Sequence, residues 1–222
     1  MKVMHILNSN SFSGAENVVI SIIRNAVSSR EKDSYIYVSP KGNIEEKLKK
    51  EHIQYKMLSK LTTKNLKVAI KEFKPDVIHA HDFTASVISA LATIGTKVKL
   101  ISHIHKNDSK MMKINIYSII YLLSTIKYNK IFLVSKAIKE EYIFGKLIKK
   151  KIEVIGNPID IKSIRMKAKK HDNYQKYDML YLGRLSNEKN PTRFIEIIAN
   201  VKNKIPNIKC GMVGDRIRKK QM

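Results

Sequence analysis

Cysteine, tryptophan and long apolar runs are nearly absent from this sequence. Its one cysteine, Cys210, excludes an internal disulfide and fits a reducing compartment, so we expect a cytoplasmic location. The uncharged, largely apolar run 114–126 has 13 residues, which fall short of the roughly 20 that span a bilayer. The apolar stretch after Met1 is too short for a signal peptide. We therefore expect a protein without a membrane-spanning helix.

Glycine is scarce as well, and the loop after the first apolar stretch contains only Gly14. The dinucleotide fingerprint G-x-G-x-x-G is therefore missing, which disfavours enzymes that use nicotinamide or flavin cofactors. His79 and His81 share one face of a strand by alternation, but no carboxylate accompanies them as a metal ligand. We expect no metal and no organic cofactor.

Acidic residues are few, with 19 Asp and Glu against 43 Lys and Arg, which gives a net charge of +24. Only 7 of the 43 cationic residues are arginine, and the lysines are spread along the whole chain. Nucleic-acid binders more often gather charge on one face and use arginine forks. A basic nucleic-acid-associated protein is therefore the lowest-ranked alternative. Diffuse lysine suits a bias in residue usage, or attraction to an anionic membrane surface, at least as well.

Short apolar runs alternate with segments of helical periodicity. Strands are expected at 3–7, 35–38, 53–58, 77–78, 98–102, 131–134, 152–155, 177–182 and 209–213. Helices are expected at 18–26, 44–51, 66–73, 83–94, 111–128, 135–144 and 191–204. This alternation predicts an α/β protein with a Rossmann-like parallel sheet. Residues 1–160 form one predicted domain, 161–176 a charged linker or surface helix, and 177–222 restart the pattern.

The segment 181–190 joins a predicted strand to a predicted helix. Asn190 is a good N-cap and Pro191 suits the first helical turn. Helix N-termini favour anions, and Arg184 and Lys189 add two cations beside this one. The pattern indicates either a phosphate or diphosphate site or a solvated loop of a lysine-rich protein.

Seven short motifs in a fixed order resemble those of family 4 glycosyltransferases, which have the GT-B fold of two Rossmann-like domains. They are Ser13-Gly-Ala-Glu16, Asp76-Val-Ile-His-Ala-His81, His103-Ile-His105, Val134-Ser-Lys136, Asn157-Pro-Ile-Asp160, Gly183-Arg-Leu-Ser-Asn-Glu-Lys-Asn190 and Val213-Gly-Asp215. The resemblance covers almost the whole chain. It implies a retaining transferase that moves a sugar from a nucleotide-sugar donor to a saccharide or lipid-linked acceptor in cell-surface polysaccharide or glycolipid synthesis.

The resemblance also implies roles for individual residues. Arg184 and Lys189 would hold the donor diphosphate without a metal, and Gly14 and Ala15 would let the backbone approach the donor phosphates. His105 would lie beside the reacting sugar. Further candidates near the ligand are Glu16, His81, His103 and Asn157.

The sequence departs from the family pattern near its end. The family's second domain needs about 150 residues or more, whereas 177–222 offers a strand, a helix and a strand. The paired glutamates that the family places on the donor sugar and ribose are missing, and Arg216 stands where the family has glycine after Val213-Gly-Asp215. We expect a second domain that is truncated and an impaired enzyme. The alternative is an inactive remnant or an acceptor-binding domain.

The predicted helix 111–128 is unusually apolar and has lysines on both flanks, at positions 106, 110, 113, 127 and 130. Such a helix is either a core helix or one that lies in a membrane interface. The second alternative predicts peripheral binding at the inner face of the cytoplasmic membrane.

Overall fold

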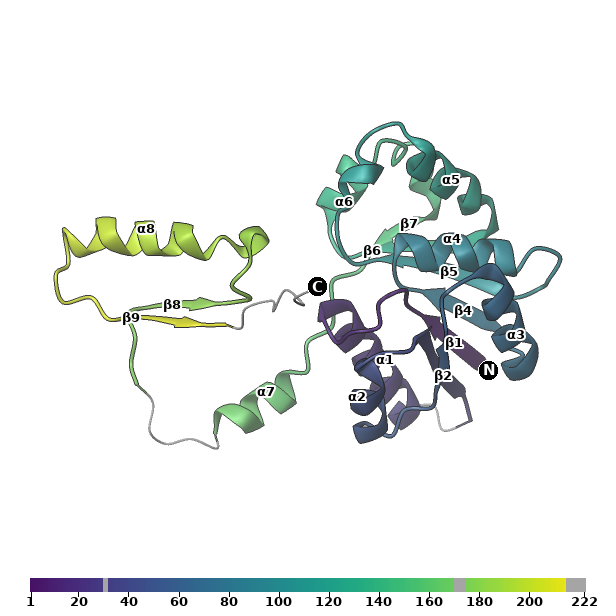
Figure 1. Cartoon of the computed structure of the whole chain (residues 1–222), viewed down its shortest axis with the longest axis horizontal. Helices are drawn as coiled ribbons and strands as arrows, with labels where there is room; N and C mark the ends of the chain where they lie inside the picture. Colours follow the sequence, from purple (N-terminus) through teal and green to yellow (C-terminus); the bar gives the residue numbers. More distant parts are fainter. Residues whose placement is uncertain (30–31, 170–174, 215–222) are drawn as a thin grey trace. The chain divides into compact units, whose positions relative to one another are not determined.

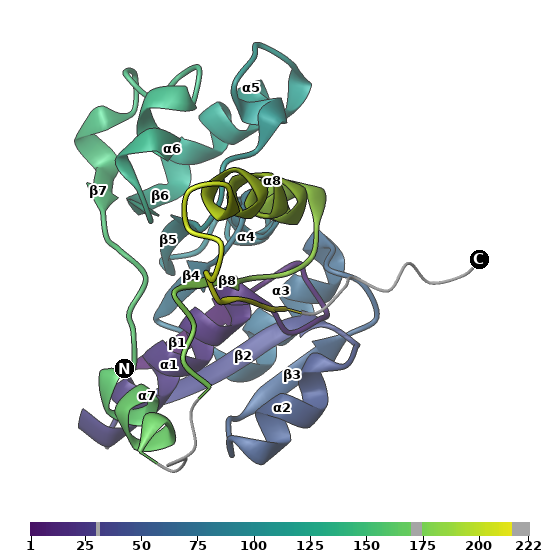
Figure 2. The ribbon, with the colours of Figure 1, turned by 90° about the vertical axis from the view of Figure 1, so that its left-hand side faces the viewer.

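The computed structural model describes residues 1–29, 32–169 and 175–214, and it contains two compact units, Met1–Asp160 and Ile161–Met222. Unit 1 is a seven-stranded sheet in the order β3-β2-β1-β4-β5-β6-β7, and every strand pair is parallel. Its strands are β1 (Lys2–Ile6), β2 (Ser34–Pro40), β3 (Tyr55–Leu58), β4 (Val77–Ala80), β5 (Lys99–Ile104), β6 (Tyr128–Leu133) and β7 (Ile152–Val154). Figure 2 shows β1, β2 and β3 running side by side.

Helices connect these strands and cover both faces of the sheet (Figure 1). They are α1 (Gly14–Ser29), α2 (Ile44–Lys50), α3 (Thr63–Phe73), α4 (Phe83–Ala92), α5 (Ile116–Ser124) and α6 (Lys136–Glu141). Short 3₁₀ turns lie at Ser109–Met111, Thr125–Lys127 and Lys149–Lys151. This is the parallel α/β architecture that the alternating pattern predicted, and each predicted strand is present with small changes at its ends.

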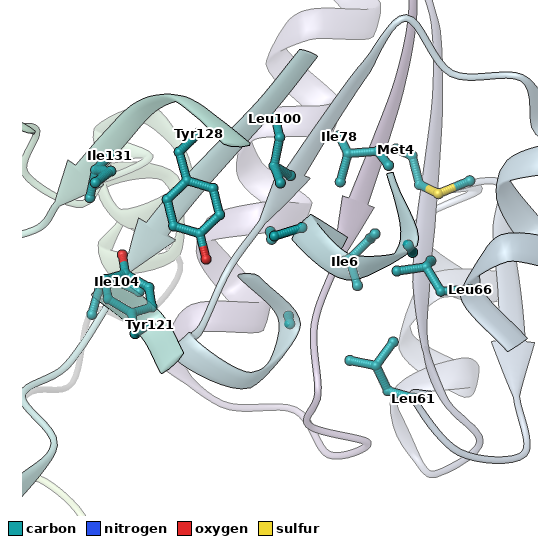
Figure 3. Packing of buried hydrophobic residues seen from close by; sticks show 14 of the residues in the cluster. Met4, Ile6, Leu61, Leu66, Ile78, Leu100, Ile104, Tyr121, Tyr128 and Ile131 are labelled. Atoms are coloured by element: carbon teal, nitrogen blue, oxygen red, sulfur yellow. The ribbon is translucent and has the colours of Figure 1, made fainter. Parts of the chain in front are cut away.

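Alternation along the strands creates two separate cores. Val3 and Leu7 of the β1 segment pack with α1 and α2 on one face, and Met4 and Ile6 pack with α3 and α4 on the other. In the larger core, side chains from three neighbouring strands lie in a row: Met4, Ile78 and Leu100 (Figure 3). The sheet is therefore buried on both faces near β1 and β4.

Capping side chains mark the starts of three helices in unit 1. The side chains of Thr62, Asp82 and Ser135 accept hydrogen bonds from the third backbone N–H of α3, α4 and α6. Each satisfies an N–H group that the helix itself leaves without a partner.

The helix predicted at 111–128 is shorter than expected. Asn115 accepts hydrogen bonds from the backbone of Tyr117 and Ser118, and the Ser118 hydroxyl accepts one from the backbone of Asn115. This capping box starts α5 at Ile116. At the other end the chain tightens into a 3₁₀ turn at Thr125–Lys127. A polar capping pair inside an apolar run therefore interrupts the predicted helix.

α5 is not a core helix, because only Ser118 and Tyr121 of its nine residues are buried. Most of its apolar side chains face outward. The exposed ones in and beside α5 are Met112, Ile114, Ile116, Tyr117, Ile119, Ile120, Leu123 and Ile126. Among the described residues, no helix combines the length and the apolarity needed to cross a bilayer.

Unit 2 contains α7 (Ile161–Ala168), β8 (Met179–Leu182), a 3₁₀ turn (Asn187–Lys189), α8 (Pro191–Lys202) and β9 (Cys210–Val213). β8 and β9 form a parallel two-stranded sheet. The range 161–176, predicted as a charged linker or a surface helix, begins with α7. The motif residue Asp215 lies outside the described residues. Gly214 is required here, because a Cβ atom on it would lie 1.8 Å from the carbonyl oxygen of Gly183.

Candidate functional site

The strand order in the sheet of unit 1 reverses between β1 and β4. The chain moves outward from β1 to β2 and β3, then returns and places β4 on the opposite side of β1. Open parallel sheets bind ligands at the carboxyl ends of the strands where this reversal occurs. The predicted residues Gly14–Glu16, His81 and His105 all follow the carboxyl ends of β1, β4 or β5.

Five histidines gather on one face of the sheet near this point. His5 and His79 are register partners on β1 and β4. Alternation brings His81 to the same face of β4 and its extension, and His103 and His105 to that face beside β5. Four of the five are buried, and His105 is partly exposed.

Three of these rings form a continuous line of hydrogen bonds across the strands. Nδ1 of His5 lies 2.9 Å from Nε2 of His81, and Nδ1 of His81 lies 3.1 Å from Nε2 of His105. Nδ1 of His105 donates to Oδ1 of Asn157 at 3.3 Å. We call His5, His81 and His105 the imidazole column. The column runs from the buried His5 to the partly exposed His105.

The other two histidines form a separate pair, with Nε2 of His79 lying 3.2 Å from Nδ1 of His103. The pair stacks on the column, because the ring centroids of His79 and His81 are 4.1 Å apart and those of His103 and His105 are also 4.1 Å apart. Hydrogen bonds therefore run across the strands, and ring stacking runs along them.

Two triplets of these histidines bring ring nitrogens within 4.8 Å of one another, namely His5-His79-His81 and His81-His103-His105. Both triplets include His81, whose two nitrogens already face His5 and His105. A metal ion at either triplet would have to break the column. The prediction that no metal is used remains a proposal.

Burial keeps these histidines neutral. It lowers the pKa of His5 to about 4 and the pKa of His103 to about 3. Burial, together with the positive charge on neighbouring imidazoles, holds the pKa values of His79 and His81 well below the usual range. At His105, burial lowers the pKa, and the Asn157 hydrogen bond and the Glu16 charge oppose this effect.

The first turn of α1 lies beside this cluster. Glu16 is buried and accepts a hydrogen bond from the Ser13 hydroxyl, so its carboxylate is held by its own loop. Gly14 has nothing within 4 Å of the position of a Cβ atom, and its backbone does not need glycine. The N–H groups of Gly14 and Ala15 belong to a helix start, which favours an anion.

Asp82 ties two loops of this region together. Its carboxylate accepts hydrogen bonds from the backbone N–H of Asn8 at 2.8 Å and of Ala85 at 2.7 Å. Burial raises the pKa of Asp82, and these two backbone bonds oppose the rise. The loop after β1 is thereby held next to the start of α4.

His103 lies within β5, because this strand extends to Ile104. It is buried and hydrogen-bonded to His79. Asn157 does reach His105, so two predicted residues from distant segments meet. His5 and His79 were not predicted as site residues. The signal was available in their alternation with Val3 and Val77, which marks one shared face of two neighbouring strands.

In unit 2, the predicted anion loop has the expected structure. The Asn190 side chain caps α8 by accepting from the Arg193 backbone, and Pro191 begins the helix. The Tyr181 hydroxyl lies 2.9 Å from the carbonyl oxygen of Arg184 and 3.3 Å from that of Lys189. It holds both ends of the loop, while the side chains of Arg184 and Lys189 are exposed.

This arrangement of strands, loops and motifs can be compared with known proteins. The family model described as Glycosyltransferase Family 4 matches residues 12–163. The chain belongs to glycosyltransferase family 4. The match covers most of unit 1 and includes Gly14 of the loop after β1 and the strand ends that carry His81 and His105.

Relatives of this family 4 chain support the assignment. An uncharacterized glycosyltransferase of Methanocaldococcus jannaschii, MJ1059, is 28% identical over 177 residues, which are 70% of this chain and 43% of the relative. HepE of Anabaena superposes with a TM-score of 0.77 at 19% identity over 98% of this chain and 62% of HepE. The lipopolysaccharide outer core galactosyltransferase WaaB gives a TM-score of 0.66 at 18% identity over 97% of this chain and 61% of WaaB. The chain thus has the GT-B type of fold and spans less than two thirds of each of these proteins.

Proposed function

We propose that this chain carries the nucleotide-sugar machinery of a retaining family 4 glycosyltransferase. Its substrates would be a nucleotide-sugar donor and a saccharide or lipid-linked acceptor of cell-surface polysaccharide or glycolipid synthesis. The loop of Arg184 and Lys189 at the start of α8 is the observation that carries the proposal. The family assignment supplies the class of reaction.

Structural neighbours support a uridine diphosphate donor. HepE was crystallised with UDP and with UDP-glucose, and the UDP-GlcNAc 2-epimerase of Neisseria meningitidis was crystallised with UDP-GlcNAc. The epimerase superposes on this chain with a TM-score of 0.61. UDP is therefore the first probe to use.

The chemistry of the unit 2 loop suits a diphosphate. An exposed guanidinium forms two parallel hydrogen bonds to phosphate oxygens, and an ammonium adds a point charge. Both cations are set beside a helix N-terminus, which contributes partial positive charge. Arg184 and Lys189 would stabilise the negative charge that develops on a leaving nucleoside diphosphate, so no metal ion is needed for this role.

The unit 1 residues would take the other roles. The helix start at Gly14 and Ala15 offers backbone donors to phosphate oxygens. His105 lies at the outer end of the imidazole column, partly exposed, and is our candidate for contact with the reacting sugar. Glu16 and His81 would position the α1 loop and His105, respectively.

Removing the Arg184 side chain is expected to weaken UDP binding by about 10- to 100-fold, because a charge-assisted hydrogen-bonded contact contributes about 1.5–3 kcal/mol. The measurement is isothermal titration calorimetry of UDP on the whole chain and on Arg184→Ala, with and without EDTA. Equal binding with EDTA would support a donor site without metal.

Arg193→Ala is the matched control for this experiment. Arg193 lies one turn into α8, is exposed and pairs with Glu196 at 3.2 Å, and its loss changes the net charge by the same amount. Equal losses of UDP affinity in both variants would mean that the effect comes from net charge and not from a specific contact of Arg184. Absence of saturable UDP binding by the folded chain would contradict the proposal and favour an inactive remnant or an acceptor-binding domain.

We also propose that the protein binds an anionic membrane surface through α5 and the lysines beside it. The exposed apolar side chains of α5 lie next to Lys110 and Lys113, and the Lys110 ammonium lies 4.3 Å from the centroid of the Tyr117 ring. Apolar surface with a basic border favours the headgroup region of anionic lipids. This docking would bring a lipid-linked acceptor to the inner face of the cytoplasmic membrane.

Leu123→Ser is expected to lower binding to anionic vesicles by about 10-fold, because inserting one leucine contributes about 1.5–3 kcal/mol. Leu123 is 61% exposed, so its loss leaves the fold intact. Flotation with phosphatidylcholine vesicles, with and without phosphatidylserine, measures the effect. Val27→Ser on α1 is the control, since Val27 is 51% exposed. Flotation that does not respond to phosphatidylserine would contradict membrane docking.

A further inference from the structure

We propose that the imidazole column fixes the tautomer of His105, so that its Nδ1 carries the proton and donates a hydrogen bond to an oxygen atom of the sugar donor. His5 and His81 are then positioning residues, although neither touches the ligand. The inference rests on the proposed function for the identity of the ligand. The tautomer itself follows from the geometry of unit 1 alone.

The direction of the hydrogen bonds is set at the outer end of the column. The Asn157 oxygen only accepts, so Nδ1 of His105 donates to it. A neutral imidazole has one N–H, so Nε2 of His105 accepts from Nδ1 of His81. By the same reasoning, Nε2 of His81 accepts from Nδ1 of His5. All three rings therefore carry their proton on Nδ1.

The inner end of the column agrees with this direction. Nε2 of His5 is buried and has no hydrogen-bond partner among the residues that the structure describes. If the hydrogen bonds run in the assigned direction, this nitrogen is unprotonated. If they ran in the reverse direction, it would carry a proton as an N–H group without an acceptor. Buried N–H groups without a partner are rare in native proteins and are costly. The inner end of the column therefore favours the same tautomers as the outer end.

Burial and stacking keep the rings in this arrangement. Burial holds the column neutral, so one proton per ring is maintained at neutral pH. His79 stacks on His81, and His103 stacks on His105, at 4.1 Å between ring centroids. The Glu16 carboxylate is the charged group that acts on His105, and the neutral imidazoles of His79 and His103 are the titratable groups stacked on the column.

The result for His105 is a polarised donor. Free histidine side chains in water prefer the Nε2–H tautomer, so the column holds His105 in the less common form. Nδ1–H is the ring position that Asn157 contacts in this structure. An oxygen acceptor, such as a sugar hydroxyl, would take the place of the Asn157 oxygen. A cationic or N–H donor group would not be accepted there.

Nuclear magnetic resonance of the imidazole nitrogens tests the tautomer directly. Two-bond ¹H–¹⁵N correlation spectra of the whole chain at pH 7.5 are expected to show His5, His81 and His105 in the Nδ1–H form. This readout does not depend on activity or on UDP binding, so it separates the inference from the proposed function. An Nε2–H form at His105 in the unmutated protein would overturn the inference.

Two phenylalanine variants test the positioning role. His81→Phe removes the donor to Nε2 of His105, and a shift of His105 toward the Nε2–H tautomer is expected. His103→Phe is the matched control, because His103 stacks on His105 but bonds to His79 instead. His105 is expected to keep its tautomer in this variant. An unchanged His105 tautomer in folded His81→Phe would overturn the role of the column, and the wild-type spectrum decides if this variant does not fold.

Discussion

Acidification from pH 7 to pH 5 is expected to destabilise unit 1 by about 7 kcal/mol, because four histidines remain neutral in the folded chain. They are His5, His79, His81 and His103, and burial lowers the pKa of each. In the unfolded chain the same side chains titrate near pH 6.5. Below that pH the unfolded state binds protons that the folded state does not take up.

The sign follows from this difference in proton binding. Stability is fully present above pH 6.5 and is lost as the pH falls toward 4, the value to which burial lowers the pKa of His5. Each histidine contributes about 2 kcal/mol between pH 7 and pH 5. Burial raises the pKa of Asp82, so its carboxyl group offsets at most one of these protons. Since domains are stable by about 5–15 kcal/mol, a loss of this size removes about half or more of the stability of unit 1.

Urea titrations at several pH values, followed by circular dichroism, measure this loss. The double variant His79→Leu/His103→Leu removes one hydrogen-bonded pair and is expected to reduce the loss to about 4 kcal/mol. His52→Asn is the control, because His52 is exposed and asparagine tolerates its φ of 53°. A loss of about 2 kcal/mol or less in the unmutated chain would mean that the cluster is not buried as described.

Tyr121→Ala is expected to lower the free energy of unfolding of unit 1 by about 3–5 kcal/mol, the usual cost of removing a buried aromatic ring. Tyr121 is 2% exposed, and its ring meets those of Phe83 and Tyr142 edge to face. Its hydroxyl also lies 2.8 Å from the Ser102 hydroxyl. Tyr121→Phe loses only this bond and is expected to cost about 1 kcal/mol.

Leu123→Ala is the matched control on the same helix, and its cost is expected to stay within about 0.5 kcal/mol. Leu123 is 61% exposed although it lies only two residues from Tyr121. Urea denaturation of the three variants at pH 7.5 measures the contrast. Equal costs for Tyr121→Ala and Leu123→Ala would show that α5 presents a different face to the core.

Local sequence patterns, which involve only neighbouring residues, predicted much of the fold. Apolar runs marked every predicted strand, and the capping residue Asn190 marked the start of α8. The apolar composition of 111–128 did not reveal the interruption at Asn115 and Ser118. Their reciprocal hydrogen bonds decide where α5 begins.

The candidate site was harder to predict because it depends on register. The sequence placed His79 and His81 on one face of a strand, which the structure bears out. It did not reveal that His5 is the register partner of His79, or that β4 and β5 align so that His81 meets His105. Those contacts join residues 76 and 24 positions apart. Strand order, which no local pattern specifies, brings them together.

The strand order of the sheet also governs how fast unit 1 folds. β1 is made first but lies at the centre, and its partner β4 follows only after a loop of more than 70 residues, with Val3 opposite Val77. Closing so long a loop costs entropy before any contact compensates, and high contact order slows folding. During synthesis, one edge of β1 therefore stays unpaired until β4 has been made. The imidazole column can therefore form only after β1, β4 and β5 have paired.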